Sequence, residues 1–395
     1  MCSTFVPLGI KSFDNKFENK YISLSYTLSD NAQEVTLQIR DGEEEIYKKV
    51  ITSPSEVSKG QHFWSWDGFD KNGILDTARL TKAKRLNYKI SVKRKNNIFS
   101  ETQYFKLSYN EVNWVDVKIN RSKKRIDVTL RVDLKDGGAG GLTYKKDIDP
   151  DPKVSELLEV HPWENISKEA LLFYGKPPIT QQLRSYKSLE RLALDGIEKY
   201  WSRNKTNKVG INVKINNDFY EVFIKAEQNS QGLSAPVIVY ETNSEESRSR
   251  NFFLSRRLFF SEGYLYYSDW KKANPKSIIY KNKGWYYRSS IKSEEKNVLL
   301  TIPLIEDFKI TAAHEIGHQI LVSFAGKNYS YSHEGTSHWS LLIQEPNDNA
   351  TEVPKIGEIN LMKYYTNSLI PERVVVSEKD LLGLLWLSKI EIKCI

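Results

Sequence analysis

The chain has 395 residues, of which 27% are charged and 12% aromatic, and this composition excludes a disordered chain and predicts two or three folded domains with prominent β-structure. The net charge of +8 comes from 58 basic and 50 acidic residues that are spread along the chain. Because no zinc finger, RNA-recognition signature or basic helix accompanies this charge, we expect no nucleic-acid partner. The two cysteines, Cys2 and Cys394, exclude a disulfide framework.

The ends of the chain predict neither a signal peptide nor a membrane span. The first thirty residues carry charges early and lack a continuous apolar core. The longest apolar run, at residues 381–387, is too short to cross a bilayer. If the protein acts outside the cytoplasm in which it is made, we expect a route other than general secretion to carry it.

Residues 13–107 predict a β-sandwich. Polar and apolar residues alternate at residues 21–26, 34–39 and 88–92, which is typical of strands that bury one face. Residues 63–73 (FWSWDGFDKNG) combine aromatic anchors with Asp-Gly and Asn-Gly turns, and they resemble the W-D-G-x-D-x-x-G element of immunoglobulin-like domains of the flagellar hook-cap type. We therefore expect an all-β, immunoglobulin-like sandwich over residues 1–109.

Residues 110–140 predict a β-hairpin followed by a linker. Alternating segments at residues 114–119 and 126–132 flank a charged turn, and the sequences GGAGG at 137–141 and DPDP at 149–152 are the clearest linker signals of the chain. We place a domain boundary near residue 140 and a further domain over residues 141–395. A long hairpin loop within one domain is the alternative interpretation.

The last domain is predicted to be of the α+β class. The expected elements are an amphipathic helix at residues 185–203, a hairpin at 209–224, a strand at 236–240, and a helix at 308–324 that Gly326 is placed to end. A helix, a sheet and a second helix in this order are expected of a zincin-type metallopeptidase domain.

The second helix carries the most informative motif of the chain, H-E-I-G-H at residues 314–318. Residues four apart lie on one face of a helix, so His314 and His318 can hold one Zn²⁺ while Glu315 acts as the general base on the attacking water. Four of the six histidines of the chain lie within residues 314–338, and chance is a poor explanation for this clustering. The alternative is a helix that carries two histidines and no metal.

A catalytic zinc needs a third protein ligand and one open position, and here the common spacings fail. The metzincin extension would require glycine in place of Leu321 and histidine in place of Phe324. The candidates further along the chain are His333, Glu334, His338, Glu345, Glu352 and Glu358.

Residues 180–395 resemble the zincin-like metallopeptidase toxins found at the C-terminus of VgrG-type spike proteins and in related type VI secretion effectors. The resemblance rests on four ordered blocks, TAAHEIGH at 311–318, YSYSHEGTS at 329–337, GEINLMKYY at 357–365 and EKDLLGLLWL at 378–387. It implies a gluzincin-like site in which His314, His318 and Glu358 bind zinc and Glu315 is the general base. The family often has a basic residue at the position of Glu334.

Physical features near Glu358 agree with this ligand set. Gly357 allows a tight turn that aims the carboxylate at the helix. Met362 resembles the methionine of a turn beneath a zinc site or is simple core filling, and Tyr365 is placed to polarise a substrate carbonyl. His333 is the rival third ligand, or else it lines the pocket or stabilises an oxyanion.

The resemblance implies a zinc-dependent metallopeptidase that acts as an antibacterial toxin, delivered by a type VI machine into the periplasm of a target cell. The implied partners are a protein or peptide substrate, a cognate immunity protein and a secretion spike or adaptor protein, with the sandwich serving in loading or substrate contact. Two alternatives stay open, a non-catalytic binding or adaptor module with a structural zinc and a peptidoglycan amidase.

Overall fold

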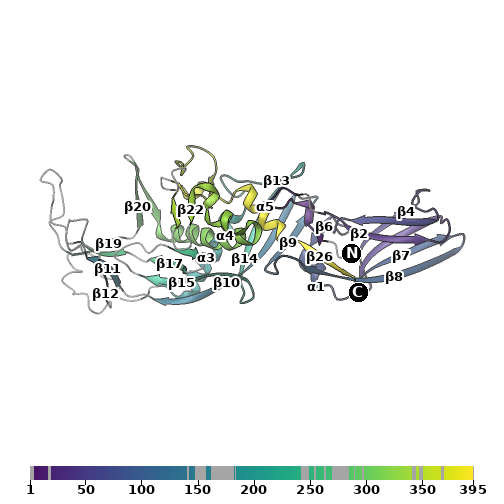
Figure 1. Ribbon diagram of the computed structural model, residues 1–395, viewed down its shortest axis with the longest axis horizontal. Helices are drawn as coiled ribbons and strands as arrows, with labels where there is room; N and C mark the ends of the chain where they lie inside the picture. Colours follow the sequence, from purple (N-terminus) through teal and green to yellow (C-terminus); the bar gives the residue numbers. More distant parts are fainter. Residues whose placement is uncertain are drawn as a thin grey trace.

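The computed structural model describes the backbone of residues 4–16, 19–139, 142–146, 157–161, 182, 184–241, 249–252, 255–261, 264–268, 284–288, 290–295, 298–339, 344–346, 350–365 and 369–394. The strands of the N-terminal sandwich lie at one end of this part of the chain, and a larger mixed sheet with its helices follows (Figure 1). Both termini lie at the sandwich (Figure 1).

The sandwich consists of a six-stranded sheet that faces a two-stranded sheet. The six strands are, in spatial order, β1 (Thr4–Phe5), β26 (Ile390–Cys394), β8 (Asn97–Tyr109), β7 (Leu86–Arg94), β3 (Glu34–Asp41) and β4 (Glu44–Ile51). The two strands of the facing sheet are β2 (Ile22–Leu28) and β5 (Gly60–Trp66). The expected strands at residues 21–26, 34–39 and 88–92 are confirmed as β2, β3 and β7.

Alternation of side chains explains why these segments are strands. Val35, Leu37 and Ile39 of β3 are buried, and the residues between them are partly exposed. The turn after β5 also has the predicted chemistry, because Trp66 Nε1 donates a hydrogen bond to the carbonyl oxygen of Phe69 at 2.8 Å. Asp70 Oδ1 accepts the backbone N–H groups of the next turn, which makes this segment a rigid connection.

The second sheet is mixed, with strand order β13, β14, β10, β15, β17, β16; in addition, β9 pairs with β10, and β6 pairs with β9. The bounds of these strands are β6 Ile74–Asp76, β9 Val115–Asn120, β10 Arg125–Ala139, β13 Val213–Ile215, β14 Asp218–Gln228, β15 Leu233–Glu241, β16 Arg250–Phe252 and β17 Ser255–Ser261. Strand β10 pairs in parallel with β14 and β15 and antiparallel with β9. The predicted hairpin at 209–224 and the strand at 236–240 are confirmed as β13, β14 and β15.

Short two-stranded pairs complete the described strands. They are β11 (Leu142–Lys146) with β12 (Leu157–His161), β18 (Tyr264–Ser268) with β19 (Gly284–Arg288), β20 (Ser290–Glu295) with β21 (Val298–Pro303), β22 (Ser337–Trp339) with β23 (Gln344–Pro346), and β24 (Ile359–Asn360) with β25 (Val374–Val375). The pair β24 and β25 is parallel, and it lies next to the candidate site described below.

The described α-helices are α1 (Thr77–Lys82), α3 (Tyr186–Trp201), α4 (Leu304–Tyr331) and α5 (Glu378–Trp386). The described 3₁₀ segments are η1 (Pro7–Gly9), η3 (His333–Gly335) and η4 (Pro371–Arg373). Helix α3 matches the predicted helix at 185–203 and is capped by Ser185, whose Oγ accepts the N–H of Ser188. Helix α4 changes direction at Gly326, which has a φ of 81°, so the prediction that Gly326 ends the first helical stretch is confirmed.

The glycine-rich stretch differs from the linker that its composition suggested. Strand β10 continues through Gly137 to Ala139 and pairs with β15 there. A Cβ atom on Gly137 would lie 2.8 Å from the carbonyl oxygen of Ile238, so glycine is needed at this position for close approach of two strands. The hairpin of β9 and β10 therefore belongs to the second sheet, and the DPDP sequence at 149–152 lies outside the described residues.

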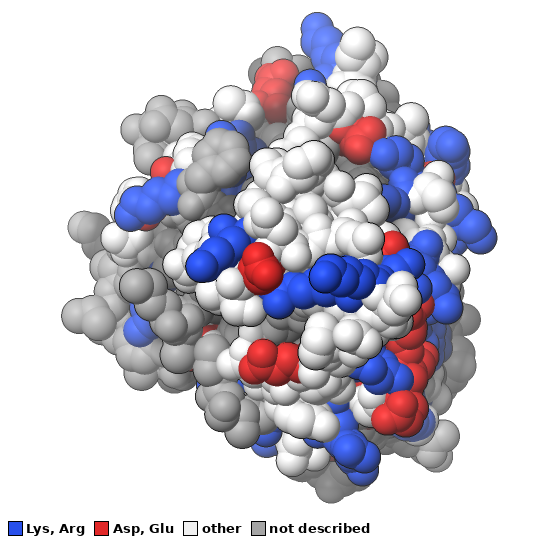
Figure 2. All heavy atoms as spheres, turned by 90° about the vertical axis from the view of Figure 1, so that its right-hand side faces the viewer, with Lys and Arg blue, Asp and Glu red and all other residues white. Residues whose placement is uncertain are grey.

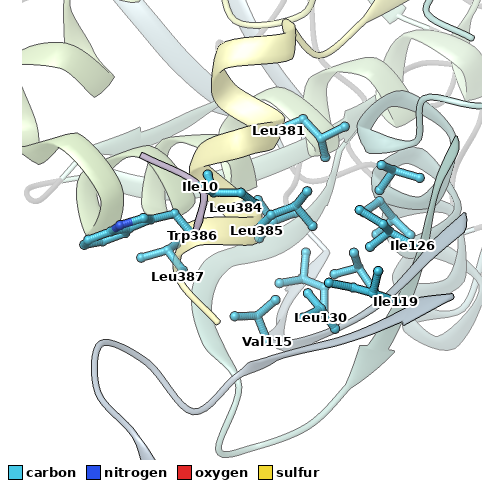
Figure 3. Close-up of a cluster of buried hydrophobic side chains, with 14 of the residues drawn as sticks. Ile10, Val115, Ile119, Ile126, Leu130, Leu381, Leu384, Leu385, Trp386 and Leu387 are labelled. Carbon is cyan, nitrogen blue, oxygen red and sulfur yellow. The ribbon is translucent and has the colours of Figure 1, made fainter. Parts of the chain in front are cut away.

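The two sheets are interlocked by strands that cross between them. Strand β6 follows the sandwich turn but pairs with β9 of the second sheet, and β26, the last strand of the chain, pairs with β8 and β1 of the sandwich. Helix α5, which leads into β26, packs its leucines toward the β9 and β10 side chains Ile119 and Ile126 (Figure 3). One continuous cluster of buried apolar side chains consequently runs through both sheets.

Within the described residues, no helix combines the length and the apolar character needed to cross a membrane.

The return of the chain to the sandwich predicts a large effect of a small change near the C-terminus. Ile390 of β26 is fully buried, so we expect Ile390→Ala to lower the free energy of unfolding of the whole chain by about 2–5 kcal/mol. Denaturant unfolding followed by tryptophan fluorescence measures this loss. Lys393→Ala in the same strand removes a half-exposed side chain and is the control, and an equal effect of both substitutions would contradict the interlocked core.

Candidate metal centre

Helix α4 presents two histidines of the H-E-I-G-H motif to one place. His314 is partly buried and His318 is 3% exposed, and their ring centroids lie 4.9 Å apart with the rings nearly perpendicular. Trp201 of α3 donates a hydrogen bond from Nε1 to the carbonyl oxygen of Ala313 at 3.1 Å, which fixes the helix next to the motif. The helical spacing alone thus places the pair as predicted.

The third member of the cluster is His333, which follows α4 in segment η3. Its ring centroid lies 4.8 Å from that of His314 and 4.8 Å from that of His318, and the side chain is 1% exposed. One nitrogen from each of the three rings lies within 4.8 Å of the others. Within the described part of the chain, this is the group of side chains whose geometry suits a metal ion.

The other ring nitrogens of the helix histidines are already used by the protein. His314 Nδ1 lies 2.8 Å from the carbonyl oxygen of Leu361, which can only accept, so Nδ1 carries the proton. His318 Nδ1 lies 3.1 Å from Ser330 Oγ, and that hydroxyl donates to the carbonyl oxygen of His318 and therefore accepts from Nδ1. Both rings thus keep Nε2 as the unprotonated nitrogen, which is the arrangement that metal-binding histidines show.

The backbone at His333 is strained. His333 and the following Glu334 both have positive φ angles, 45° and 52°, in a region that costs roughly 1–3 kcal/mol for residues with a side chain. The Glu334 carboxylate holds this conformation, because it accepts hydrogen bonds from Tyr329 Oη at 3.0 Å and from Asn360 Nδ2. The strained turn is what brings His333 back over the helix.

A buried carboxyl group supports the same turn from helix α5. Asp380 is fully buried, and its Oδ1 lies 2.9 Å from Tyr329 Oη, the hydroxyl that also contacts Glu334. Burial, followed by the nearby charge of Glu334, raises the pKa of the Asp380 carboxyl well above its usual value. A protonated Asp380 is consistent with this geometry, since two ionised carboxylates that share one hydroxyl would repel each other.

Glu358, the third ligand that the resemblance implied, is not brought to the histidines. Its two carboxylate oxygens accept hydrogen bonds from both terminal nitrogens of Arg203 at 2.7 and 2.8 Å. Arg203 is itself buried and also donates to the carbonyl oxygens of Asn212 and Val376. The Glu358 carboxylate is therefore engaged in a structural ion pair with Arg203. The geometry favours His333 as the third metal ligand, so that the candidate ligand set is three histidines instead of two histidines and a glutamate.

The other candidates whose side chains are described are not members of the three-histidine cluster. Glu334 supports the turn as described, and neither His338 nor Glu352, both exposed, is part of the three-histidine group. The side chain of Glu345 lies outside the described residues. Of the five candidates whose side chains the structure describes, His333 is the one that it brings to His314 and His318.

Tyr365 and its neighbour Tyr364 have different positions. The Tyr365 hydroxyl accepts the backbone N–H of Asn360 at 3.0 Å, and burial raises its pKa, so this side chain stabilises the loop. Tyr364, which the sequence did not single out, has its ring centroid 3.7 Å from that of His333 and 6.0 Å from that of His314. Tyr364 is the tyrosine in contact with the three-histidine cluster.

Met362 lies beneath the helix, at the level of the motif. It is 1% exposed, and a Cβ atom on Gly317 would lie 2.7 Å from its sulfur and 2.8 Å from a ring atom of Trp201. The glycine of H-E-I-G-H is therefore required by packing, since any side chain there would push Met362 or Trp201 away. The sequence left open whether Met362 fills the core or lies beneath the metal site, and in the structure it does both.

Glu315, the expected base, follows His314 on α4 and is 8% exposed. Its backbone carbonyl accepts a hydrogen bond from Asn251 Nδ2 of the edge strand β16 at 2.6 Å, so strand and helix are joined at this residue. Nearby, burial raises the pKa of the Tyr331 hydroxyl, and the charge of Glu315 contributes to the shift. The motif glutamate consequently lies in a largely dehydrated environment next to the histidines.

The chemistry of the donor set fits zinc. Neutral imidazole nitrogens are good ligands for Zn²⁺, and three of them with an open fourth position form one of the standard catalytic zinc sites. His314 and His318 keep Nε2 unprotonated as this role requires. His314, His318 and His333 are therefore the residues that would hold the ion.

Several supporting groups were missed by the sequence analysis. Leu361 acts through its backbone oxygen, which no side-chain pattern reports, and Ser330 and Asp380 act across loops whose closure is not encoded locally. A signal did exist for Asp380 and Tyr364, since both lie inside the blocks at 378–387 and 357–365 on which the family resemblance rests.

Comparison with known proteins identifies the N-terminal part of the chain. A family model described as the FlgD Ig-like domain matches residues 12–96. The sandwich is therefore immunoglobulin-like, as the turn at residues 63–73 predicted. No curated protein matches the chain. The zincin-type assignment of residues 141–395 stays a prediction from the sequence. In this region the structure shows α3, α4, α5 and the later strands of a mixed sheet that begins with β6, β9 and β10.

The geometry predicts which third residue controls metal binding. We expect His333→Ala to weaken Zn²⁺ binding by more than about 100-fold, beyond the roughly 10- to 100-fold loss seen when only an orienting group is removed. Glu358→Gln should leave the affinity unchanged, because Gln still accepts a hydrogen bond from Arg203. Competition with a chelating dye measures both constants. A large loss of affinity in Glu358→Gln with little loss in His333→Ala would instead show that Glu358 is the third ligand.

The raised pKa of Asp380 predicts a pH dependence of stability. In the unfolded chain this carboxyl ionises near pH 4, as free aspartate does, whereas the folded chain keeps its proton to a higher pH. The folded state then binds more protons, so the stability that this group contributes falls as the pH rises above 4. We expect Asp380→Asn to remove part of the fall in Tm between pH 5 and pH 8.

The matched control for this measurement is Asp14→Asn, since the Asp14 side chain is 67% exposed. Thermal unfolding of the three proteins at both pH values provides the comparison. A wild type and an Asp380→Asn variant that change in parallel would show that Asp380 is ionised in the folded chain.

Proposed function

We propose that this protein is a zinc-dependent hydrolase of peptide bonds that uses His314, His318 and His333 to hold the ion. The observation that carries the proposal is the convergence of the three rings, two of them with Nδ1 engaged by the protein. A bound zinc supplies Lewis-acid chemistry that polarises a carbonyl and makes a water molecule more acidic.

The proton transfers fall to Glu315. Its carboxylate takes a proton from the attacking water and returns it to the nitrogen of the departing amine, as a general base and then a general acid. The largely buried position of Glu315 leaves its carboxylate few competing contacts with bulk water.

The presence of Glu315 between the histidines favours an enzyme over a binding module with a structural zinc. A structural site needs no base and closes its fourth position with a protein ligand, whereas the described residues supply three ligands to this cluster. The ring of Tyr364 lies against His333 and forms part of the surroundings in which a substrate would bind.

The wider biological role that we propose rests on the family resemblance of residues 180–395. It makes the protein an antibacterial effector of the type VI system that acts in the target-cell periplasm. A cognate immunity protein would block it, and a spike or adaptor protein would deliver it. The immunoglobulin-like sandwich is then the part available for contact with the delivery partner.

Substitution of the base tests the enzyme. We expect Glu315→Gln to keep zinc binding and to lower kcat on a fluorogenic peptide library by about 10²- to 10⁴-fold, which is the contribution of a general base. Glu352→Gln changes an exposed acid outside the cluster and serves as the control. Full activity of Glu315→Gln would refute the mechanism.

Growth of a bacterium that expresses the protein in its periplasm is the second readout, and we expect wild type but not Glu315→Gln to inhibit it. Incubation with purified sacculi separates the two hydrolases that the sequence left open. Release of stem peptides from sacculi with no cleavage of the peptide library would assign the site to an amidase.

A further inference from the structure

The immunoglobulin-like sandwich has a vacant strand position beside β2. Among the described strands, β2 and β5 face the six-stranded sheet, and β2 is paired on one side, with β5. On the other side of β2 a hollow of about 620 Å³ extends over the inner faces of β7 and β8. We call this hollow the β2 groove, and the side chains that matter to it are Ser25, Thr27, Ile90, Val92, Phe99 and Glu101.

The floor of the β2 groove continues the face that is buried elsewhere in the sandwich. Val92 pairs with Val35 of β3 on one side and with Phe99 of β8 on the other, so the three side chains share one face of the sheet. Val35 is fully buried under the facing sheet, whereas Phe99 is 56% exposed. The inner face of the sheet is therefore covered over β3 and left open over the first part of β8, before the buried Phe105 and Leu107.

The edge of β2 is suited to pairing. Its sequence, ISLSYTL, contains no charged residue and no proline, although natural edge strands often carry one of these to prevent pairing. The Tyr88 hydroxyl reaches the carbonyl oxygen of Ser25 at 3.5 Å, which shows that the backbone groups of Ser25 point away from β5. By the alternation of a strand, those of Thr27 point into the groove as well.

Charged groups along the groove define the occupant further. Glu101 is paired across the strands with Ile90 and lies on the same open face as Phe99, two residues away. Among the residues that the structure describes, its carboxylate makes neither a hydrogen bond nor an ion pair. Arg94 closes the other end through hydrogen bonds to Ser29 and Asp30, and its buried Nε has no acceptor in the described part of the chain.

The end face of the sandwich carries charges of both signs (Figure 2). The sandwich end of the molecule carries a band of Lys and Arg with acidic and uncharged side chains around it (Figure 2). A mixed surface of this kind gives no field of a single sign that would steer a partner from a distance. Recognition must therefore depend on the groove itself.

We propose that the β2 groove binds an extended segment of a partner protein as an added strand beside β2. Main-chain hydrogen bonds to Ser25 and Thr27 supply the affinity. Alternate side chains of the segment face the floor, where an apolar one packs on Val92 and Phe99 and a Lys or Arg, two residues along, pairs with Glu101.

Seven-residue peptides test the proposal on the full-length protein. The peptides alternate Thr with inward-facing Val, and one inward position holds Lys, Ala or Glu. Fluorescence anisotropy measures their dissociation constants. We expect the Lys peptide to bind about 10-fold more tightly than the Glu peptide, and Glu101→Lys to reverse this order, because like charges in a groove oppose binding.

Two neighbouring residues provide a matched pair of variants. Phe99 and Ile98 are both exposed apolar residues of β8, but they lie on opposite faces, and only Phe99 lines the groove. We expect Phe99→Ala to weaken binding of the Lys peptide by about 10-fold and Ile98→Ala to leave it unchanged. Thr27→Pro removes an outward N–H that an edge strand can lose without unfolding, and it should abolish binding.

Three results would overturn the proposal. They are an absence of binding by all peptides at millimolar concentration, an equal loss for Phe99→Ala and Ile98→Ala, and a concentration-dependent dimer that Thr27→Pro dissociates. The last result, seen by sedimentation velocity, would assign the edge of β2 to a second copy of this chain.

Discussion

The candidate site depends on how closely helix α4 packs against its neighbours. A Cβ atom on Gly196 of α3 would lie 2.2 Å from the carbonyl oxygen of Lys309, and one on Gly317 would lie 2.7 Å from the sulfur of Met362. Glycine at both positions lets backbone meet backbone and lets Met362 lie directly under the helix. Because these contacts fix the rotation and height of α4, they also fix the direction of His314 toward the loop that holds it.

How far the site could be predicted depends on the range of the interactions involved. The positions of His314 and His318 follow from helical periodicity, which is local, and the sequence alone places them together. The position of His333 requires a turn with two positive φ angles, held by Asn360 and by Asp380 from much later in the chain. No local pattern encodes that closure. The burial of Arg203 beside Glu358, 155 residues later, is likewise invisible in the sequence, although this contact is what separates Glu358 from the histidines.

The fold shows the same division between local and long-range information. Alternation identifies β2, β3, β7, β13, β14 and β15, because a strand with one buried face has a period of two. Pairing partners are a different matter, and nothing in residues 390–394 indicates that they complete a sheet begun by residues 4–5. The glycine-rich stretch at 137–141 suggested a linker because glycine favours flexible segments, yet Gly137 lies inside β10 where two strands approach closely. One residue type has two physical uses, and composition does not distinguish them.

The same continuity constrains how the two ends of the molecule can influence each other. Helix α5 contributes Asp380 to the support of His333, and within a few residues the chain continues as β26 and pairs with β8, which forms part of the floor of the β2 groove. Physical connection is not sufficient for allosteric coupling, which requires an element with two arrangements of similar free energy. The buried cluster runs without interruption through α5, β9 and β10, and a well-packed core has one arrangement. Binding of a partner segment beside β2 should therefore determine which partner the protein is attached to, and it should leave the chemistry at the three histidines unaltered.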